Sequence, residues 1–266
     1  ASVRTFRPWV ITTAMVGRHR VERAIRLSTK QPDTIFSVDN AQNVTDLNEA
    51  AKAAGRKVRV AADLAVSSRT GITPGEPAVG LVEHITRQSN LEFQGIQAYA
   101  GHCAHILGFE NRKKGSEEAM GRAVETRRML EKKGIACNWL SGGSTGTYNI
   151  DSHIDGITEI QPGSFLFMDI DYNRIGGKDT GTVYQDFANS LTVLATAYSK
   201  PSDDFVVLDA GLKAFSTDKP FPPEAREIEG AKYAFAGDEH GKLDVRAAAK
   251  KVNLGDRVEL VTPHCD

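Results

Sequence analysis

Up to about Met168, short apolar runs alternate with longer segments in which apolar positions recur every three or four residues. The short runs predict six strands: Val10–Thr13, Thr34–Val38, Val58–Asp63, Gly95–Tyr99, Cys137–Ser141 and Thr158–Gln161. The longer segments predict helices, notably His19–Ser28, Val44–Ala54, Pro77–Gln88 and Ser116–Lys133. Strands and helices that repeat in one direction predict an α/β fold with a parallel sheet covered by helices.

The number of strands leaves two architectures open. A TIM-type (β/α)8 barrel needs eight strands, whereas six strands also suit an open doubly wound sheet. Only a very short helix fits between Cys137–Ser141 and Thr158–Gln161. This short connection favours a barrel, because the last loops of that fold commonly form a phosphate-binding corner.

From about Gly181 the pattern changes to short strands separated by turn-rich segments rich in Pro, Ser and Asp. The strands are predicted at Leu191–Tyr198, Phe205–Asp209, Tyr233–Ala236 and Arg257–Thr262. This pattern predicts a smaller all-β domain at 181–266, which follows an α/β domain at 1–180.

Composition narrows the class of protein. The 266 residues are 40% hydrophobic and 25% charged, and the formal net charge of −1 gives no reason to expect nucleic acid or an anionic membrane as a partner. No apolar stretch approaches the ~20 residues of a membrane span, and no signal-peptide pattern opens the chain. Three widely spaced cysteines suit a reducing compartment, so we expect a cytoplasmic protein.

A glycine-rich loop, Ser141–Thr147, directly follows a predicted strand. Glycines allow the backbone to approach an anion, and amides and hydroxyls supply donors, so the loop is a candidate phosphate site. A flexible Gly/Ser turn is the other interpretation, since no dinucleotide or Walker motif is present. The Gln161–Ser164 segment follows the next strand and favours the phosphate site, because consecutive late barrel loops share this role.

Three further candidates lie just after predicted strands, at the edge where barrel active sites are found. Arg69 can bind a phenolate or carboxylate, and Tyr99 can stack on a ring or donate to it. His102 follows Tyr99 closely, and His105 is expected to be structural. An arginine in a surface loop and a half-buried tyrosine are the alternatives.

The segment His264-Cys265-Asp266 predicts a metal site. In an extended segment, His264 and Asp266 point to the same face, whereas Cys265 points to the other. An imidazole and a carboxylate suit a divalent cation such as zinc or manganese. An ordinary surface histidine is the alternative for His264 alone.

Taken together, five segments resemble the D-threonine aldolase family, pyridoxal-phosphate enzymes of the alanine-racemase fold. They occur in the family's order: Ser141–Thr147, Gln161–Tyr172, Asp209–Asp218, Asp238–Gly241 and Pro263–Asp266. The related D-serine and D-hydroxyaspartate dehydratases typically carry His-x-Cys in place of the terminal His-x-Asp. Asp266 therefore favours the aldolase.

The resemblance implies roles for individual residues. Pyridoxal phosphate would be bound by Arg69, Tyr99, Gly143, Ser144, Thr145, Gly163 and Ser164. His264 and Asp266 would bind a divalent metal (Mn, Zn or Mg), and His102 is the candidate catalytic base. The family's cofactor-bearing lysine belongs to the first barrel strand, in a motif that this sequence lacks; Lys213 does not match it. The six strands would then be barrel strands three to eight, so we expect part of a longer enzyme.

The expected function is retro-aldol cleavage of D-threonine and related D-β-hydroxy-α-amino acids to glycine and an aldehyde. The alternatives are a D-serine or D-3-hydroxyaspartate dehydratase of the same fold and a non-catalytic pyridoxal-phosphate-binding protein. The expected partner is a small D-amino acid, not nucleic acid or membrane, and relatives of this fold suggest a homodimer.

Overall fold

The computed structural model describes residues 9–265, which form two compact units. The first unit runs to Ala104 and resumes at Arg112–Pro162; the second comprises His105–Asn111 and the chain from Gly163 onward. The sequence placed a boundary near residue 180. In the structure, residues before 180 already belong to the second unit. Main-chain hydrogen bonds from Ile170 N to Thr262 O (3.1 Å) and from Asp171 N to Pro263 O (3.2 Å) join them to its β-rich part.

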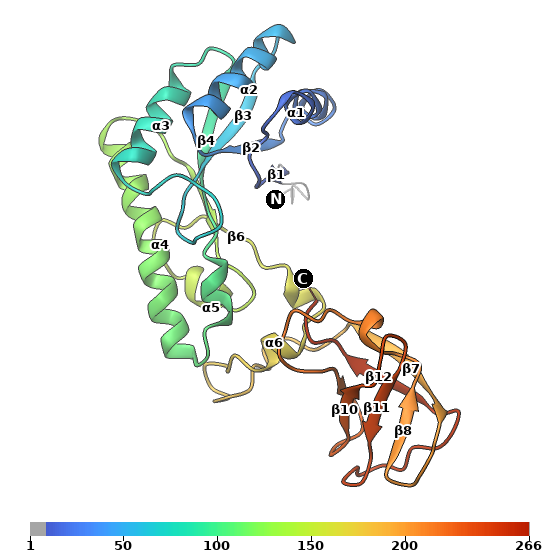
Figure 1. The fold of residues 1–266 in the computed structure, drawn as a ribbon. Helices are drawn as coiled ribbons and strands as arrows, with labels where there is room; N and C mark the ends of the chain where they lie inside the picture. The colour runs from blue at the N-terminus through green and yellow to red at the C-terminus, as the bar shows by residue number, and fades with distance from the viewer. Residues whose placement is uncertain (1–8, 266) are drawn as a thin grey trace, which may run out of the picture. The chain divides into compact units, whose positions relative to one another are not determined.

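The first unit is built on a parallel sheet whose six strands follow one another in chain order, β1 to β6. Figure 1 shows this alternation of strand and helix along the blue-to-green part of the chain. The strands are β1 (Val10–Ile11), β2 (Ile35–Val38), β3 (Val58–Asp63), β4 (Leu91–Ala98), β5 (Trp139–Gly142) and β6 (Glu159–Ile160). A doubly wound sheet reverses its strand order at a switch point, whereas a barrel does not. The strand order therefore identifies part of a barrel, as expected.

Amphipathic helices connect these strands. They are α1 (Arg18–Lys30), α2 (Ala41–Ala53), α3 (Glu76–Thr86), α4 (Phe109–Lys132) and the one-turn α5 (Tyr148–Asp151). Buried apolar residues of α1, α2 and α3 pack with β2 and β3 into one core, which includes Phe36, Val38, Leu47 and Ile85. Asn40 caps α2, since its side chain accepts from Asn43 N at 2.8 Å.

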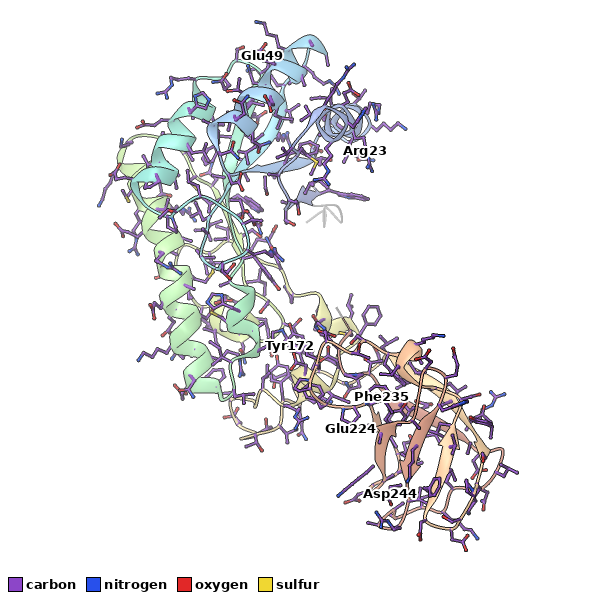
Figure 2. The ribbon with its side chains drawn as sticks, viewed as in Figure 1. Arg23, Glu49, Tyr172, Glu224, Phe235 and Asp244 are labelled. Atoms are coloured by element: carbon purple, nitrogen blue, oxygen red, sulfur yellow. The ribbon has the colours of Figure 1, made fainter. Side chains whose placement is uncertain are left out.

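The second unit contains an antiparallel sheet in the order β10-β11-β8-β7-β12-β9. Its strands are β7 (Thr192–Ser199), β8 (Phe205–Leu208), β9 (Glu224–Ala225), β10 (Lys232–Phe235), β11 (Gly241–Asp244) and β12 (Arg257–Val261). Figure 2 labels Phe235 and Asp244 toward opposite ends of the β10–β11 hairpin, where Phe235 pairs with Gly241 and Lys232 with Asp244. Alternating residues such as Val206, Leu208, Val258 and Leu260 form the core.

Two strands of this unit escaped the sequence pattern. β9 has only two residues, and β11 (Gly241–Asp244) alternates buried and more exposed positions but carries few β-forming side chains. β11 forms because β8 and β10 flank it on both sides. Pairing supplied by neighbouring strands is a tertiary effect, which local propensity does not report.

Within residues 9–265, no helix combines the length and apolar character needed to cross a bilayer.

Candidate functional site

The loop after β3 holds Arg69 against Tyr99. The loop is closed at its base, since Ile72 N donates to Asp63 O at 2.9 Å and Thr70 Oγ1 donates to Asp63 Oδ2 at 2.7 Å. The Arg69 guanidinium carbon lies 5.0 Å from the centre of the Tyr99 ring, which follows β4. This is cation–π geometry. The structure thus brings together the two residues predicted to contact the cofactor ring.

Burial raises the pKa of the Asp63 carboxyl to about 6, although Thr70 and Arg69 oppose the shift. The unfolded chain releases this proton near pH 4, so between about pH 4 and pH 6 the folded state binds more protons. Stability from this group is therefore lost as pH rises through that window.

Replacing Asp63 with asparagine should remove this loss while keeping an acceptor for Thr70. The unfolding free energy of the variant, relative to that of the wild type, should therefore rise by about 2 kcal/mol from pH 4.5 to pH 7.5. Urea unfolding at both pH values measures this gain, with exposed Asp155→Asn as the control. Identical pH dependence in wild type and D63N would contradict the assignment.

A row of polar side chains crosses the ends of three strands. Gln97, Ser141 and Glu159 are register partners on β4, β5 and β6, so they share a face of the sheet. Ser141 Oγ donates to Glu159 Oε1 at 2.8 Å, and Gln161 Nε2 lies 2.6 Å from Gln97 Oε1 and 2.7 Å from Ser141 Oγ. This row was not predicted, although polar residues at the last inward positions of apolar strands are a signal that could have revealed it.

The predicted phosphate loop is held from behind by buried polar groups. Asp151 is fully buried and accepts hydrogen bonds from Ser116 Oγ and Thr147 Oγ1, each at 2.5 Å. Arg112, also fully buried, donates from Nε to Gly146 O at 2.7 Å. Burial raises the pKa of Asp151, while hydrogen bonds from Ser116 and Thr147 oppose the shift.

Gly143 is required by the shape of this loop. Its φ of +74° lies in the left-handed region, and a Cβ there would lie 2.7 Å from Asp151 Oδ2. A left-handed glycine within such a turn is typical of concave backbone nests that bind anions. The conformation of the loop therefore fits a phosphate.

Both hydrogen-bond donors of Ser144 are directed at Thr147 within the loop, which the sequence did not predict. Its N–H donates to Thr147 Oγ1 at 3.1 Å, and the two hydroxyls lie 3.2 Å apart. Because the Thr147 proton goes to Asp151, the Ser144 hydroxyl is the donor toward Thr147. Binding a phosphate through Ser144 therefore requires one of these two donors to turn away. Thr145 is buried in the same loop.

The other two predicted phosphate residues belong to the second unit. Ser164 is buried at the start of a 3₁₀ turn, Ser164–Leu166, and its carbonyl accepts from Met168 N at 2.7 Å. A Cβ on Gly163 would meet nothing within 4 Å. Close packing within the protein therefore does not require glycine at 163, which leaves room there for an approaching group.

His264 lies in the second unit, just beyond β12, and its ring is oriented by a carboxylate. Nδ1 lies 2.8 Å from Asp218 Oδ2, and the side chain of His264 is only 17% exposed. Partial desolvation raises the pKa of Asp218, but hydrogen bonds from Ser216, its own backbone and His264, together with the His264 charge, outweigh it and lower the pKa. Asp218 thus stays ionised at neutral pH.

A second histidine accompanies His264, although the sequence assigned it only a structural role. The ring centroids of His105 and His264 lie 6.5 Å apart, and His105 packs on Tyr172 at 4.6 Å. Asp171 Oδ2 lies 2.8 Å from His105 Nδ1 and 2.7 Å from Lys219 Nζ. Tyr172, labelled in Figure 2, is fully buried and belongs to α6 (Ile170–Asn173).

His102, the predicted base, is exposed and belongs to the first unit, with Nε2 3.4 Å from Cys103 Sγ.

The metal-ligand prediction is described only in part, because Asp266 lies outside residues 9–265. Over the described residues, no three His, Cys, Asp or Glu side chains converge as a metal site. A histidine whose Nδ1 bonds to a carboxylate is nevertheless the usual arrangement of a metal-binding imidazole. His264 therefore fits a divalent cation.

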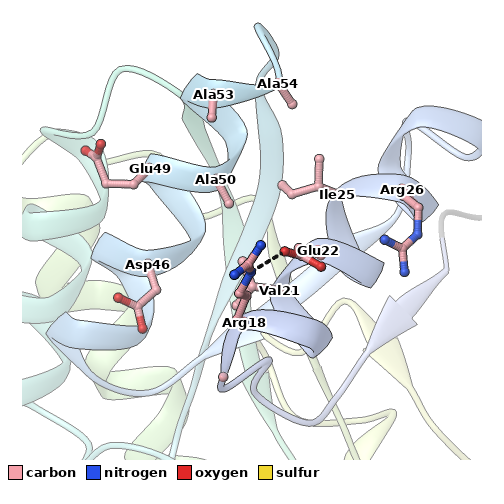
Figure 3. Close-up of a pocket in the computed structure, with 11 residues that line it drawn as sticks. Arg18, Val21, Glu22, Ile25, Arg26, Asp46, Glu49, Ala50, Ala53 and Ala54 are labelled. Carbon is pink, nitrogen blue, oxygen red and sulfur yellow. Dashed lines mark hydrogen bonds and ion pairs between the residues drawn. The ribbon is translucent and has the colours of Figure 1, made fainter.

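A groove of the first unit has a volume of about 720 Å³ and lies between α1 and α2. Figure 3 shows Ala50, Ala53 and Ile25 along it, together with the Arg18–Glu22 ion pair within α1. It contains none of the predicted site residues.

Comparisons with known proteins agree with the fold and the motifs. Residues 10–171 match the family model "Alanine racemase, N-terminal domain", and residues 190–266 match "Putative serine dehydratase domain". The chain is 34% identical to 3-hydroxy-D-aspartate aldolase of Paracoccus denitrificans (strain Pd 1222) over 97% of this chain and 66% of that protein. It is 35% identical to D-threonine aldolase of an Arthrobacter species over 86% and 59%.

Among solved structures, the D-threonine aldolase of Filomicrobium marinum superposes with a TM-score of 0.88 at 30% identity, and the match covers 96% of this chain and 68% of that one. The chain spans less than two thirds of the length of the Paracoccus and Arthrobacter enzymes, at 66% and 59%. The first family model covers more than half of the sequence. The resemblance seen in the motifs is confirmed: the chain belongs to the alanine racemase N-terminal-domain family and is related to its D-threonine and 3-hydroxy-D-aspartate aldolases.

Proposed function

We propose that this chain forms part of a pyridoxal-phosphate- and divalent-metal-dependent lyase. The enzyme cleaves D-threonine and related D-β-hydroxy-α-amino acids to glycine and an aldehyde. The observation that carries the proposal is the His264–Asp218 pair beside His105 and Asp171, in a chain related to D-β-hydroxy-amino-acid aldolases. When bound, pyridoxal phosphate supplies an electron sink for charge at the substrate Cα, and the cation supplies a Lewis acid for the β-hydroxyl.

Residues of the first unit would hold the cofactor. Arg69 places a permanent positive charge beside the Tyr99 ring, which suits the phenolic oxygen of pyridoxal phosphate. The nest at Gly143–Thr145 suits its phosphate. Buried Asp151 and Arg112 keep that loop in shape before the cofactor arrives, so little ordering is required on binding.

Residues of the second unit would act on the β-hydroxyl. His264 and Asp266 would hold the cation. His105 is the histidine close to His264, and the Asp171 carboxylate at 2.8 Å favours a proton on Nδ1. A proton on Nδ1 places the basic lone pair on Nε2. We propose His105 as the base that accepts the hydroxyl proton, in addition to the sequence candidate His102.

The second candidate function is dehydration of the same substrates. The match of residues 190–266 to a serine dehydratase domain favours it, because that segment carries His264. In that reaction the β-hydroxyl leaves after Cα–H removal, and the products are a keto acid and ammonia. Asp266 stands where the dehydratase pattern has a cysteine, and this difference favours the aldolase.

The products distinguish the two reactions. The purified protein with pyridoxal phosphate, Mn²⁺ and D-threonine should release acetaldehyde and glycine in equal amounts, and L-threonine should give neither. Ammonia with 2-oxobutanoate would instead identify the dehydratase. Borohydride reduction with pyridoxal phosphate present, followed by peptide mass mapping, identifies the lysine that holds the cofactor. Absence of both product pairs and of any adduct would contradict an enzymatic function.

A homodimer and a cytoplasmic location remain predictions for this protein, and sedimentation and cell fractionation test them.

A further inference from the structure

The backbone around His264 is fixed by the opposite segment of its own unit. Asp169 is fully buried and uses both carboxylate oxygens: Oδ1 accepts from Tyr172 N and Oδ2 from Cys265 N, each at 2.8 Å. Together with the main-chain bonds that join residues 170–171 to Thr262 and Pro263, these contacts hold the residues on either side of His264. The Cα of His264 is therefore placed before any ligand binds.

The ring of His264 is fixed separately, by a loop about 46 residues earlier in the chain. Asp218 Oδ2 lies 2.8 Å from Nδ1, and Ser216 Oγ on the same loop donates to His264 O at 3.3 Å. Asp218 is itself 52% exposed, and an exposed ion pair alone stabilises a fold little. An effect of Asp218 on the ring is therefore easier to observe than an effect on folding.

We propose that Asp218 is a positioning residue for a divalent cation at His264. An ionised carboxylate only accepts hydrogen bonds, so its partner nitrogen must carry the proton. With the proton fixed on Nδ1, the lone pair lies on Nε2, which becomes the ligating nitrogen. The negative charge of Asp218 also makes the imidazole a stronger donor to the cation. This inference rests on the cation of the proposed function.

Two alternative roles for Asp218 make different predictions. If Asp218 were only a surface partner of His264, its loss would change neither the tautomer nor cation affinity. If it were itself a cation ligand, asparagine would bind the cation nearly as poorly as alanine does. As a positioning residue, Asp218→Asn should retain part of the effect, because the amide oxygen still accepts from Nδ1–H.

Cation affinity is the first measurement. Titration of the purified protein with Mn²⁺, followed by the paramagnetic resonance of the free ion, should show affinity reduced about 10–100-fold in Asp218→Ala. Asp218→Asn should lie between this variant and the wild type. Asp203→Ala removes another carboxylate from the same unit at a 96%-exposed site and should leave affinity unchanged. Circular dichroism melts confirm that the variants fold.

The tautomer is the second measurement, and it does not depend on activity. Two-bond ¹H–¹⁵N correlation spectra of the metal-free protein should show His264 protonated on Nδ1 in the wild type, and protonated on Nε2 or averaged in D218A. Wild-type Mn²⁺ affinity in D218A, equal losses in D218A and D218N, or an Nε2–H tautomer in the wild type would each overturn the inference. A wild type that binds no Mn²⁺, with His264→Ala indistinguishable from it, would contradict the cation of the proposed function as well.

Discussion

Replacing His264 with alanine is expected to abolish cation-dependent cleavage of D-β-hydroxy-α-amino acids while leaving the protein folded. Polarisation of the reacting oxygen by a bound cation contributes several kcal/mol, so a loss of about 10²–10⁴-fold in kcat is expected. The cost to folding should be small, because Asp218, the partner of the His264 ring, is half-exposed, and because Asp169 and main-chain bonds hold the backbone on either side of His264.

Steady-state kinetics over a range of Mn²⁺ concentrations, combined with thermal melts, measures both parts of this prediction. His19→Ala is the matched control, since that ring is 95% exposed on α1 in the other unit. A variant at 264 that retained wild-type kcat and Mn²⁺ dependence would contradict the role of His264. A variant that failed to fold would contradict the view that the hydrogen bond from Cys265 N to Asp169 is sufficient to hold the segment around residue 264.

Replacing Asp151 with alanine is expected to have the largest effect on stability among the site residues. The change leaves the buried hydroxyls of Ser116 and Thr147 without their acceptor and opens a cavity behind the loop. Each unsatisfied buried group costs about 1–3 kcal/mol, so the unfolding free energy should fall by about 2–4 kcal/mol. Asp151 also fixes the shape of the loop through Thr147, so cofactor affinity should fall about 10-fold, equivalent to about 1.4 kcal/mol.

Urea unfolding and titration with pyridoxal phosphate, followed by its absorbance, measure these two losses. Asp155→Ala is the control, because it removes an exposed carboxylate four residues further along the chain. Asp151→Asn should be less damaging, since an amide can still accept one of the two hydroxyl protons. Unchanged stability in D151A would mean that the network does not support the loop.

The secondary structure of this chain follows closely from its sequence pattern. Val58–Asp63 is both the predicted and the observed β3, and α1 to α3 differ from their predictions by a few residues at the ends. These elements bury one regular face, so their apolar spacing contains the information that places them. α4 begins earlier than predicted, at Phe109, because its first turns carry polar residues without apolar periodicity.

For the candidate site, too, local sequence indicated the types of residue but not their partners. The residue types at Arg69, Gly143 and His264 led to the predictions of cofactor-ring, phosphate and metal binding, because a guanidinium group, a glycine-rich turn and an imidazole suit those ligands. Their partners were not predictable. Asp218 and His264 are 46 residues apart, Asp151 and Ser116 are 35 apart, and Asp171 and His105 are 66 apart. No local pattern connects such pairs.

The sequence by itself therefore determined most of the elements, the family and the kinds of side chain proposed for the site, because each of these depends on residue identity and short-range spacing. Only the tertiary structure decided the order of the parallel strands, the pairing that makes β11 a strand, and the carboxylates that lie beside His105 and His264. Burial turns a carboxylate such as Asp151 into a structural support, and burial is a property of the packed chain rather than of any segment of it.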